Sequence, residues 1–346
     1  MMLKDLLKRA LPPTTQMVDR RVELLSEQNR ALEGGLARLQ DELAALSEEA
    51  RQTRRALEAL RAQGARTELA RRAALPLEGA PAVVLSLASY GARIKTLADT
   101  LRSLDAQTVR PDRLLLWLPA SDFPAREADL PDDVVCAIAD ARAELRWAED
   151  DLGPHNKYLG VLEAFPASVL ITVDDDIRYA PDLVERLLAA HERWPEAVCA
   201  LRTNLVRVEG DKLLPYDQWT LEQRELLDEP SHRLLATGNA GVLYPPACLD
   251  RHVTDRAAIR ATCLMADDLW LKVMELMAGT KVVCLSGPFE LDCVEGTQES
   301  ALWAQNLTGG RNDIQLRAIL DLVGQLRPAE ELVALMANDN EGEKLS

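Results

Sequence analysis

The chain has 346 residues and a formal charge of −16 at pH 7, from 40 Lys and Arg against 56 Asp and Glu. Hydrophobic residues make up 47% of the sequence, which is too apolar for a chain that stays disordered. A surface this acidic repels nucleic acid phosphates, so the composition argues against a nucleic acid partner.

Residues 1–15 predict a short N-terminal helix that carries leucines on one face and Lys4, Lys8 and Arg9 beside them. A helix that lies on a membrane surface can have this pattern. Eleven residues with three cations bind a bilayer weakly, however, so an ordinary frayed terminus is the favoured interpretation. We therefore expect at most peripheral membrane contact.

Residues 16–72 predict a coiled coil, because apolar residues recur at alternating spacings of four and three. Asn29 falls in the first column of this heptad seam, where a buried amide favours a parallel two-stranded register. A single helix has no core against which to bury the seam, so we expect a homodimer. A helix folded back on the rest of the chain, or a different protein partner, is the alternative. The first column is Val22, Asn29, Leu36, Leu43, Ala50 and Leu57, and the second is Val18, Leu25, Leu32, Leu39, Leu46 and Leu60.

Residues 73–81 read as a linker, residues 82–325 as an α/β domain and residues 326–346 as a tail. Apolar runs predict strands at 82–89, 113–119, 134–139, 168–173 and 197–201, and amphipathic stretches predict helices at 94–106, 157–165 and 181–194. Near-continuous apolar strands separated by helices indicate a mostly parallel sheet that is covered on both faces. Ligands of such sheets bind at the carboxyl ends of the strands.

Three adjacent carboxylates, Asp174, Asp175 and Asp176, follow the predicted strand at 168–173. They repel one another, and this is costly beside an apolar strand unless a cation neutralises them. Oxygen ligands of this kind suit Mg²⁺ or Mn²⁺. In extended backbone Asp174 and Asp176 would face one side and Asp175 the other. An acidic turn that caps the next helix is the alternative.

A second acidic pair, Asp267 and Asp268, begins an amphipathic helix. Carboxylates in a first turn also favour the helix dipole, so a purely structural role is the alternative to a chemical one.

The opening VVLSLASYGARIKTLADTLRSLDAQ, the DDD and the later ADDLW together resemble a GT-A glycosyltransferase of the large inverting group often called family 2, over about residues 80 to 315. The resemblance implies a Rossmann-like nucleotide-binding half merged with an acceptor-binding half. It implies a nucleotide-diphosphate sugar donor, with UDP expected, a Mn²⁺ or Mg²⁺ cofactor and a glycan or lipid-linked acceptor. The expected setting is bacterial surface polysaccharide or glycoconjugate synthesis.

The resemblance also implies roles for individual residues. Asp176 and Asp174 would hold the metal. Asp268 would be the base that deprotonates the acceptor hydroxyl, with Asp267 in the place of the usual Glu, and the assignment between these two stays open. The residues expected to bind the donor are Ser89, Tyr90, Arg93, Lys157, Asp174, Asp175, Gly238 and Asn239.

Several of these assignments have alternatives. Lys157, beside His155, would meet a phosphate or the base of the donor, or else pair with Asp150 or Asp151 on a surface loop. Gly238 and Asn239 would line the sugar or acceptor pocket or form a plain tight turn. The candidates near the C-terminus, which would contact the diphosphate or acceptor or form a helix cap, are Asn306, Arg311, Asn312 and Asp313.

No histidine follows His252, so the metal would depend on the DDD and the diphosphate alone. Six cysteines without a C-x-x-C pair indicate a reducing compartment, and no apolar stretch reaches the length of a signal peptide or membrane span. We expect a cytoplasmic protein, with the inner face of the membrane as an alternative.

Two other functions are compatible with these patterns. A phosphohydrolase or phosphotransferase would use the first Asp of the DDD as a nucleophile and would give the ADDLW segment no role. A non-catalytic coiled-coil assembly protein would carry a transferase-like domain without activity.

Overall fold

The computed structural model describes residues 15–295 and 310–339. The predicted N-terminal helix, apart from its last residue, and Asn306 lie outside these residues. The chain divides into two compact units, residues 1–60 and 61–346. None of the described helices is long and apolar enough to cross a membrane.

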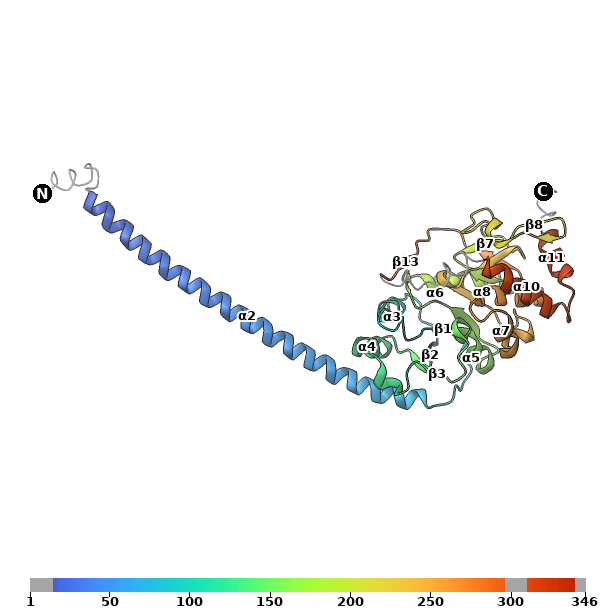
Figure 1. Cartoon of the computed structure of the whole chain (residues 1–346), viewed down its shortest axis with the longest axis horizontal. Coiled ribbons are helices and arrows are strands. Elements are labelled where there is room, and N and C mark those ends of the chain that lie inside the picture. Colours follow the sequence, from blue (N-terminus) through green and yellow to red (C-terminus); the bar gives the residue numbers. More distant parts are fainter. Residues whose placement is uncertain (1–14, 296–309, 340–346) are drawn as a thin grey trace. The chain divides into compact units, whose positions relative to one another are not determined.

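The first unit is the N-terminal part of helix α2 (Thr15–Ala73), which is a single unbroken helix (Figure 1). It confirms the predicted long helix. The leucines of both heptad columns have between 58 and 71% of their surface exposed. Their apolar seam is therefore uncovered within the described chain.

The second unit begins with the last turns of α2, which pack against the domain. Ala62 and Leu69 are buried, and the Arg66 guanidinium donates a hydrogen bond of 2.6 Å to the carbonyl of Leu130. Residues 61–73 are therefore part of the folded domain as well as the end of the predicted coil.

A seven-stranded sheet forms the centre of the second unit, in the order β12-β6-β11-β4-β1-β2-β3. Strand β11 runs antiparallel to β4 and β6, and the other neighbouring pairs are parallel. The prediction of an α/β fold with a mostly parallel sheet is confirmed. The strands are β1 (Val83–Ala88), β2 (Arg113–Pro119), β3 (Glu144–Ala148), β4 (Val169–Thr172), β6 (Val198–Ala200), β11 (Val242–Tyr244) and β12 (Val282–Cys284).

The order of the strands locates a ligand site before any side chain is considered. The chain passes from β1 to β2 to β3 in one direction and then returns to place β4 on the other side of β1. The connections that leave β1 and β4 therefore diverge, which opens a crevice at their carboxyl ends. Ser89 follows β1, and the three aspartates follow β4.

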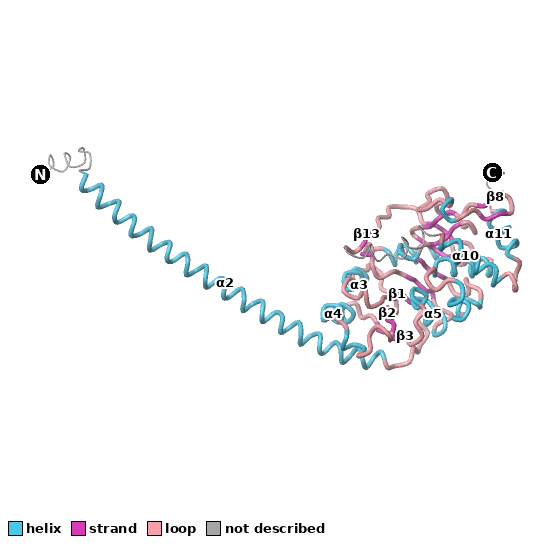
Figure 2. Tube along the Cα trace, in the orientation of Figure 1, coloured by secondary structure: helices cyan, strands magenta, loops and turns pink. Residues whose placement is uncertain are grey.

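Alternate residues of each strand enter two separate cores, one on each face of the sheet. Leu114, Leu116 and Leu118 of β2 pack on one face, and Leu115 packs on the other. Figures 1 and 2 show the helices around the strands. The first core includes α3 (Leu97–Asp105), α4 (Asp132–Asp140) and α6 (Leu183–Arg193), and the second includes α5 (Asn156–Ala164), α7 (Arg256–Thr262), α8 (Asp267–Ala278), α10 (Arg311–Val323) and α11 (Ala329–Asn338).

The strand prediction at 134–139 is wrong, because these residues lie in helix α4. Val134, Val135, Ala137 and Ile138 are buried together, at the spacing of one helical face. The third strand is instead β3, whose alternating polar and apolar residues suit an edge position that pairs only with β2.

The remaining elements extend the domain beyond the predicted boundary at 325. Helix α11 lies in the segment assigned to a tail, and its Leu332, Val333 and Met336 are buried in the core. Three small two-stranded sheets complete the fold: β5 (Ile177–Arg178) with β13 (Asp292–Cys293), β7 (Thr203–Leu205) with β10 (Leu234–Ala236), and β8 (Val208–Glu209) with β9 (Lys212–Leu213).

A buried ion pair inside α8 gives a testable prediction about stability. The ammonium of Lys272 lies 3.2 Å from the carboxylate of Glu275, and both side chains are almost fully buried. Burial raises the pKa of Glu275 to about 7, although the charge of Lys272 opposes this. Lys272→Met leaves the carboxylate without its cation, so we expect the free energy of unfolding in urea at pH 8 to fall by about 3 to 5 kcal/mol.

The loss should be smaller at pH 6, because a carboxyl group with a raised pKa becomes neutral as the pH falls. The double variant Lys272→Met/Glu275→Leu should recover most of the stability, since it removes the buried charge as well. Equal stability of the single and double variants would contradict this account.

Candidate functional site

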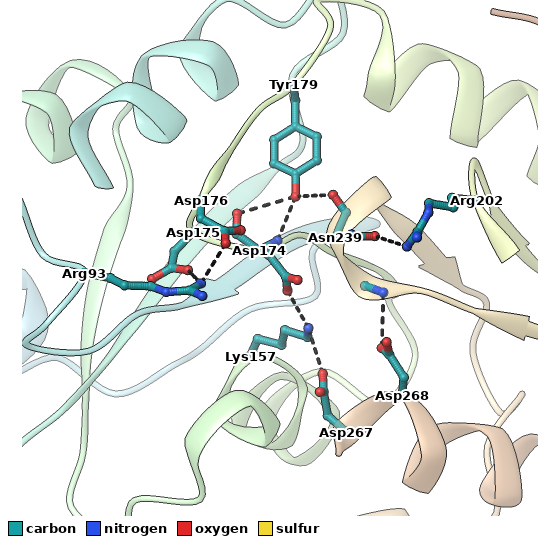
Figure 3. Close-up of polar contacts among 11 residues, drawn as sticks. Arg93, Lys157, Asp174, Asp175, Asp176, Tyr179, Arg202, Asn239, Asp267 and Asp268 are labelled. Carbon is teal, nitrogen blue, oxygen red and sulfur yellow. Dashed lines mark hydrogen bonds and ion pairs between the residues drawn. The ribbon is translucent and has the colours of Figure 1, made fainter. Parts of the chain in front are cut away.

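The carboxylate turn, Asp174 to Asp176, begins two residues after β4 ends. Asp175 and Asp176 lie in a turn, so the alternation of extended backbone does not apply. One nitrogen of Arg93, Nη1, lies 2.8 Å from Asp175 Oδ1 and 3.0 Å from Asp176 Oδ2 (Figure 3). The expectation that Asp175 faces away from Asp176 is therefore wrong.

The carboxylate turn keeps an excess of negative charge despite Arg93. Burial and then the charge of Asp174 raise the pKa of Asp176 to about 6, and Arg93 only partly opposes this. Burial alone would lower the pKa of Arg93, but the charges of Asp175 and Asp176 raise it above its ordinary value. The turn thus favours a further cation.

The residues after β1, expected to contact the nucleotide, lie at the same edge of the sheet. Ser89 is buried, and its N–H donates to the carbonyl of Trp117 at 3.0 Å. The Arg93 guanidinium lies over the ring of Tyr90, 5.7 Å from its centre. The guanidinium of Arg93 therefore holds the carboxylate turn in this structure, while Tyr90 flanks it.

Lys157 lies on α5 and is 3% exposed. Its Nζ lies 2.7 Å from Asp174 Oδ1 and 2.7 Å from Asp267 Oδ2. The alternative of pairing with Asp150 or Asp151 is wrong. Lys157 instead joins the carboxylate turn to the acidic pair (Figure 3).

The acidic pair, Asp267 and Asp268, forms the first turn of α8, but its members have different surroundings. Asp267 is buried against Lys157, and although burial raises its pKa, the charges of Lys157 and His155 and hydrogen bonding together lower that pKa below its ordinary value. Asp268 is partly exposed and accepts a hydrogen bond of 3.1 Å from the N–H of Gly238. Burial and then the charge of Asp267 raise the pKa of Asp268 well above its ordinary value. One carboxyl is held as an anion, and the other binds a proton more readily than an ordinary aspartate does.

The glycine loop, residues 237–239, lies between β10 and β11 and is held from two sides. The Tyr179 hydroxyl donates to the carbonyl of Asn239 at 3.1 Å and accepts the N–H of Asp174 at 2.8 Å. Arg202 Nη1 donates to Asn239 Oδ1 at 3.1 Å. A Cβ on Gly238 would lie 2.7 Å from the Nζ of Lys157, so any larger residue there would displace the ammonium. Gly238 and Asn239 therefore lie inside the candidate site.

Tyr179 and Arg202 were not among the residues expected from the sequence. Arg202 follows β6 by two residues, and β6 is parallel to β4 through their shared neighbour β11. Examining the carboxyl end of every predicted strand would have identified it. Nothing in the sequence around Tyr179 indicates its contact with a loop sixty residues further along the chain.

Other predicted candidates lie outside these contacts. His155 is buried, with Nε2 2.9 Å from the carbonyl of Cys263 and Nδ1 2.6 Å from the Tyr158 hydroxyl. A carbonyl only accepts, so Nε2 carries the proton and Nδ1 accepts from Tyr158. Asp313 Oδ1 accepts the backbone N–H of Tyr216 at 2.9 Å, while Arg311 and Asn312 begin α10 beside it.

A divalent metal fits the carboxylate turn as a partial site. Among the described residues, no group of three His, Cys, Asp or Glu side chains has the geometry of a complete metal site. Mg²⁺ and Mn²⁺ are commonly held by one or two carboxylates together with substrate phosphates and water. Asp174 and Asp176 supply hard oxygen atoms for such a site, and the raised pKa of Asp176 marks the unneutralised charge.

Comparison with known proteins gives likenesses of structure only. No protein-family model and no curated protein matches the chain. The chain is similar to residues 1–349 of TarS from S. aureus in complex with UDP, at 14% identity over 70% of this chain and 72% of that one, with a TM-score of 0.40. It is also similar to the mannosyltransferase PcManGT from Pyrobaculum calidifontis in complex with GDP-Man and Mn²⁺, at 12% identity over 83% and 84% of the two chains, with a TM-score of 0.39. Likenesses this remote do not indicate an activity, so the function has to be inferred from the residues of the site.

Proposed function

We propose that the protein is a metal-dependent glycosyltransferase, which moves a sugar from a nucleotide-diphosphate donor, with UDP expected as the nucleotide, to the hydroxyl of a glycan or lipid-linked acceptor. The proposal depends above all on one observation. The ammonium of Lys157 forms ion pairs with both the carboxylate turn and the acidic pair, so these two acidic segments lie in one site. A carboxylate turn suits a metal-bound diphosphate, and a carboxyl with a raised pKa suits a general base. Metal-dependent sugar transfer with inversion needs both in one site.

The different surroundings of the acidic pair support Asp268 as the base. Asp267 is held as an anion by Lys157, so its charge already has a partner. Asp268 has no ion pair within 4.0 Å among the residues that the structure describes, and its partly exposed carboxyl is the one open to an acceptor. The Gly238 N–H fixes one of its oxygen atoms and leaves the other for the acceptor hydroxyl.

The proposed reaction is a single displacement at the anomeric carbon. The acceptor oxygen forms a bond to this carbon while the bond to the diphosphate oxygen breaks, and Asp268 takes the proton of the acceptor hydroxyl. A divalent metal bound by Asp174 and Asp176 would neutralise the charge of the departing diphosphate. Arg93 holds Asp175 and Asp176 in place, and Tyr179 fixes the backbone of Asp174 against the glycine loop.

A ligand panel tests the proposal. We expect UDP or another nucleoside diphosphate to raise the melting temperature of the full chain in the presence of Mn²⁺ and much less in its absence, because ligand binding stabilises the folded state. The matching nucleotide sugar should then release its diphosphate slowly to water. Release of inorganic phosphate from simple phosphate esters would favour the phosphohydrolase instead, and no response to any nucleotide would favour the non-catalytic assembly protein.

We also propose that helix α2 pairs in parallel with α2 of a second copy of the chain. The last turns of α2 pack on the domain through Ala62 and Leu69, which are f positions when the heptad is continued past Leu60. The a and d positions of the same turns, Gly64 and Thr67, are exposed. These last turns therefore pack on the domain through the side of the helix opposite the seam.

Removal of residues 1–60 should convert a dimer into a folded monomer in light scattering. The cut belongs at residue 60, because Ala62 and Leu69 are part of the domain core and a deletion to residue 72 would remove them. Leu36→Asp together with Leu43→Asp should dissociate the full chain in the same way, while Asp41→Ala at an f position serves as the control. A monomeric full-length chain at micromolar concentration would disprove this pairing.

A further inference from the structure

Lys157 connects three elements that carry different parts of the proposed chemistry. Its own helix is α5, Asp174 belongs to the turn after β4, and Asp267 begins α8. Both ion pairs have an N–O distance of 2.7 Å, and the Lys157 side chain is almost fully buried. The two carboxylates thus share one cation in a position where water hardly reaches.

Gly238 of the glycine loop lies next to the same ammonium. A Cβ added to Gly238 would lie 2.7 Å from Lys157 Nζ, 3.2 Å from Asp268 Oδ1 and 3.4 Å from Asp174 Oδ1. A side chain at position 238 would therefore lie close to Lys157, Asp268 and Asp174 at once.

Asp174 has two competing uses in this arrangement. Its Oδ1 is held by Lys157, and the proposed function requires the same carboxylate as a metal ligand. A divalent cation bound by Asp174 would be repelled by the nearby ammonium of Lys157. A carboxylate that is shared between two cations also attracts each of them less strongly than it would attract one alone. Asp267 has no such second use.

We propose that Lys157 is a positioning residue that competes with the divalent metal for Asp174 and, once the metal is bound, holds Asp267 as its main partner. The inference rests on the proposed function. In the free protein Lys157 stands in for the missing cation and keeps the carboxylates from repelling one another. Metal binding at Asp174 would leave Lys157 paired mainly with Asp267, so the acidic pair would be held most firmly when the donor is present.

Substitution of Lys157 should therefore move two properties in opposite directions. Lys157→Met removes the competing charge at similar side-chain length, so we expect Mn²⁺ to bind the nucleotide-free full chain about tenfold more tightly. Turnover should fall at least about tenfold, because Asp267 then loses its only ion-pair partner within 4.0 Å in the described structure and the acidic pair loses its position. A residue with only a structural role would weaken both properties.

The Mn²⁺ affinity is measured by titration of the electron paramagnetic resonance signal of free Mn²⁺, and the fold by circular dichroism.

Gly238→Ala is the second variant, because it keeps the lysine charge but displaces its ammonium. We expect tighter Mn²⁺ binding and lower turnover here too, both less marked than in Lys157→Met. Gly64→Ala is the control, because a Cβ there meets no atom within 4 Å and the position lies outside the site.

The outcomes separate this inference from the proposed function. Unchanged or weaker Mn²⁺ binding in folded Lys157→Met overturns the competition, even if the wild-type chain binds Mn²⁺ and transfers sugar. If Lys157→Met does not fold, the Mn²⁺ affinity of Gly238→Ala decides by the same criterion. A wild-type chain that binds no Mn²⁺, with or without UDP, overturns both this inference and the metal requirement of the proposed function.

Discussion

Asp268→Asn should lower turnover by roughly two to four orders of magnitude, the usual contribution of a positioned general base. The amide keeps the shape of the side chain and its acceptor oxygen for the Gly238 N–H, but it cannot take a proton. Mn²⁺ and donor binding should survive, because among the described residues Asp268 makes no hydrogen bond to the carboxylate turn. Initial rates with a working donor and acceptor, together with UDP binding by calorimetry, measure the two effects separately.

The pH dependence gives a second readout of the same residue. Burial and the charge of Asp267 raise the pKa of Asp268, so its proton-accepting form should be lost at a higher pH than for an ordinary aspartate as the solution is acidified. The rate of the wild-type chain should therefore fall on the acid side of this raised pKa. The residual rate of Asp268→Asn should lack that limb.

Asp267→Asn is the matched control for this experiment. It removes one of the two carboxylate partners of Lys157, so we expect a smaller loss of turnover accompanied by lower thermal stability. Full activity of Asp268→Asn with loss in Asp267→Asn would reverse the assignment. If Asp268 only favoured the dipole of α8, its substitution would cost about 0.3 to 1 kcal/mol of stability and leave the rate almost unchanged.

Asp176→Asn should abolish Mn²⁺-dependent donor binding and at the same time stabilise the metal-free fold. The pKa of Asp176 is raised to about 6, so the folded state disfavours its charged form, and this penalty is present above that pH. Removing the charge at pH 7.5 should raise the free energy of unfolding by on the order of 1 to 3 kcal/mol. Loss of binding together with a gain in stability is hard to explain by misfolding.

Calorimetric titration with UDP and Mn²⁺, alongside urea unfolding, checks this prediction. Asp211→Asn on the exposed β8–β9 hairpin is the control, because it removes one negative charge from a residue that takes no part in the contacts of the candidate site. In the wild-type chain, Mn²⁺ affinity should weaken as the pH falls below about 6, when Asp176 becomes protonated. Unchanged metal dependence in Asp176→Asn would show that Asp176 is not a ligand.

Strands β1, β2, β4 and β6 could be predicted because each is a run of apolar residues bounded by turn residues, and such a run fits a sheet buried on both faces. Strand β11, which lies between β4 and β6, was not among the predicted strands. The rule that ligands bind at the carboxyl ends of parallel strands then directed attention to Asp174 and Asp176. The strand prediction for residues 134–139 was wrong because a short apolar run suits a buried strand and a buried helix equally well. Their packing beneath α3 decides for the helix.

By itself, then, the sequence determined the α/β class, the heptad seam of α2 and the presence of two acidic segments. Each of these is a local pattern, which depends only on residues that are close together in the chain. Only the tertiary structure decided how the acidic segments are used. Lys157 lies 17 residues from Asp174 and 110 from Asp267, and no local pattern states that one ammonium contacts both. Ion pairs and close backbone approaches of this kind depend on the relative placement of α5, β4, the glycine loop and α8, which the packing of both cores sets as a whole.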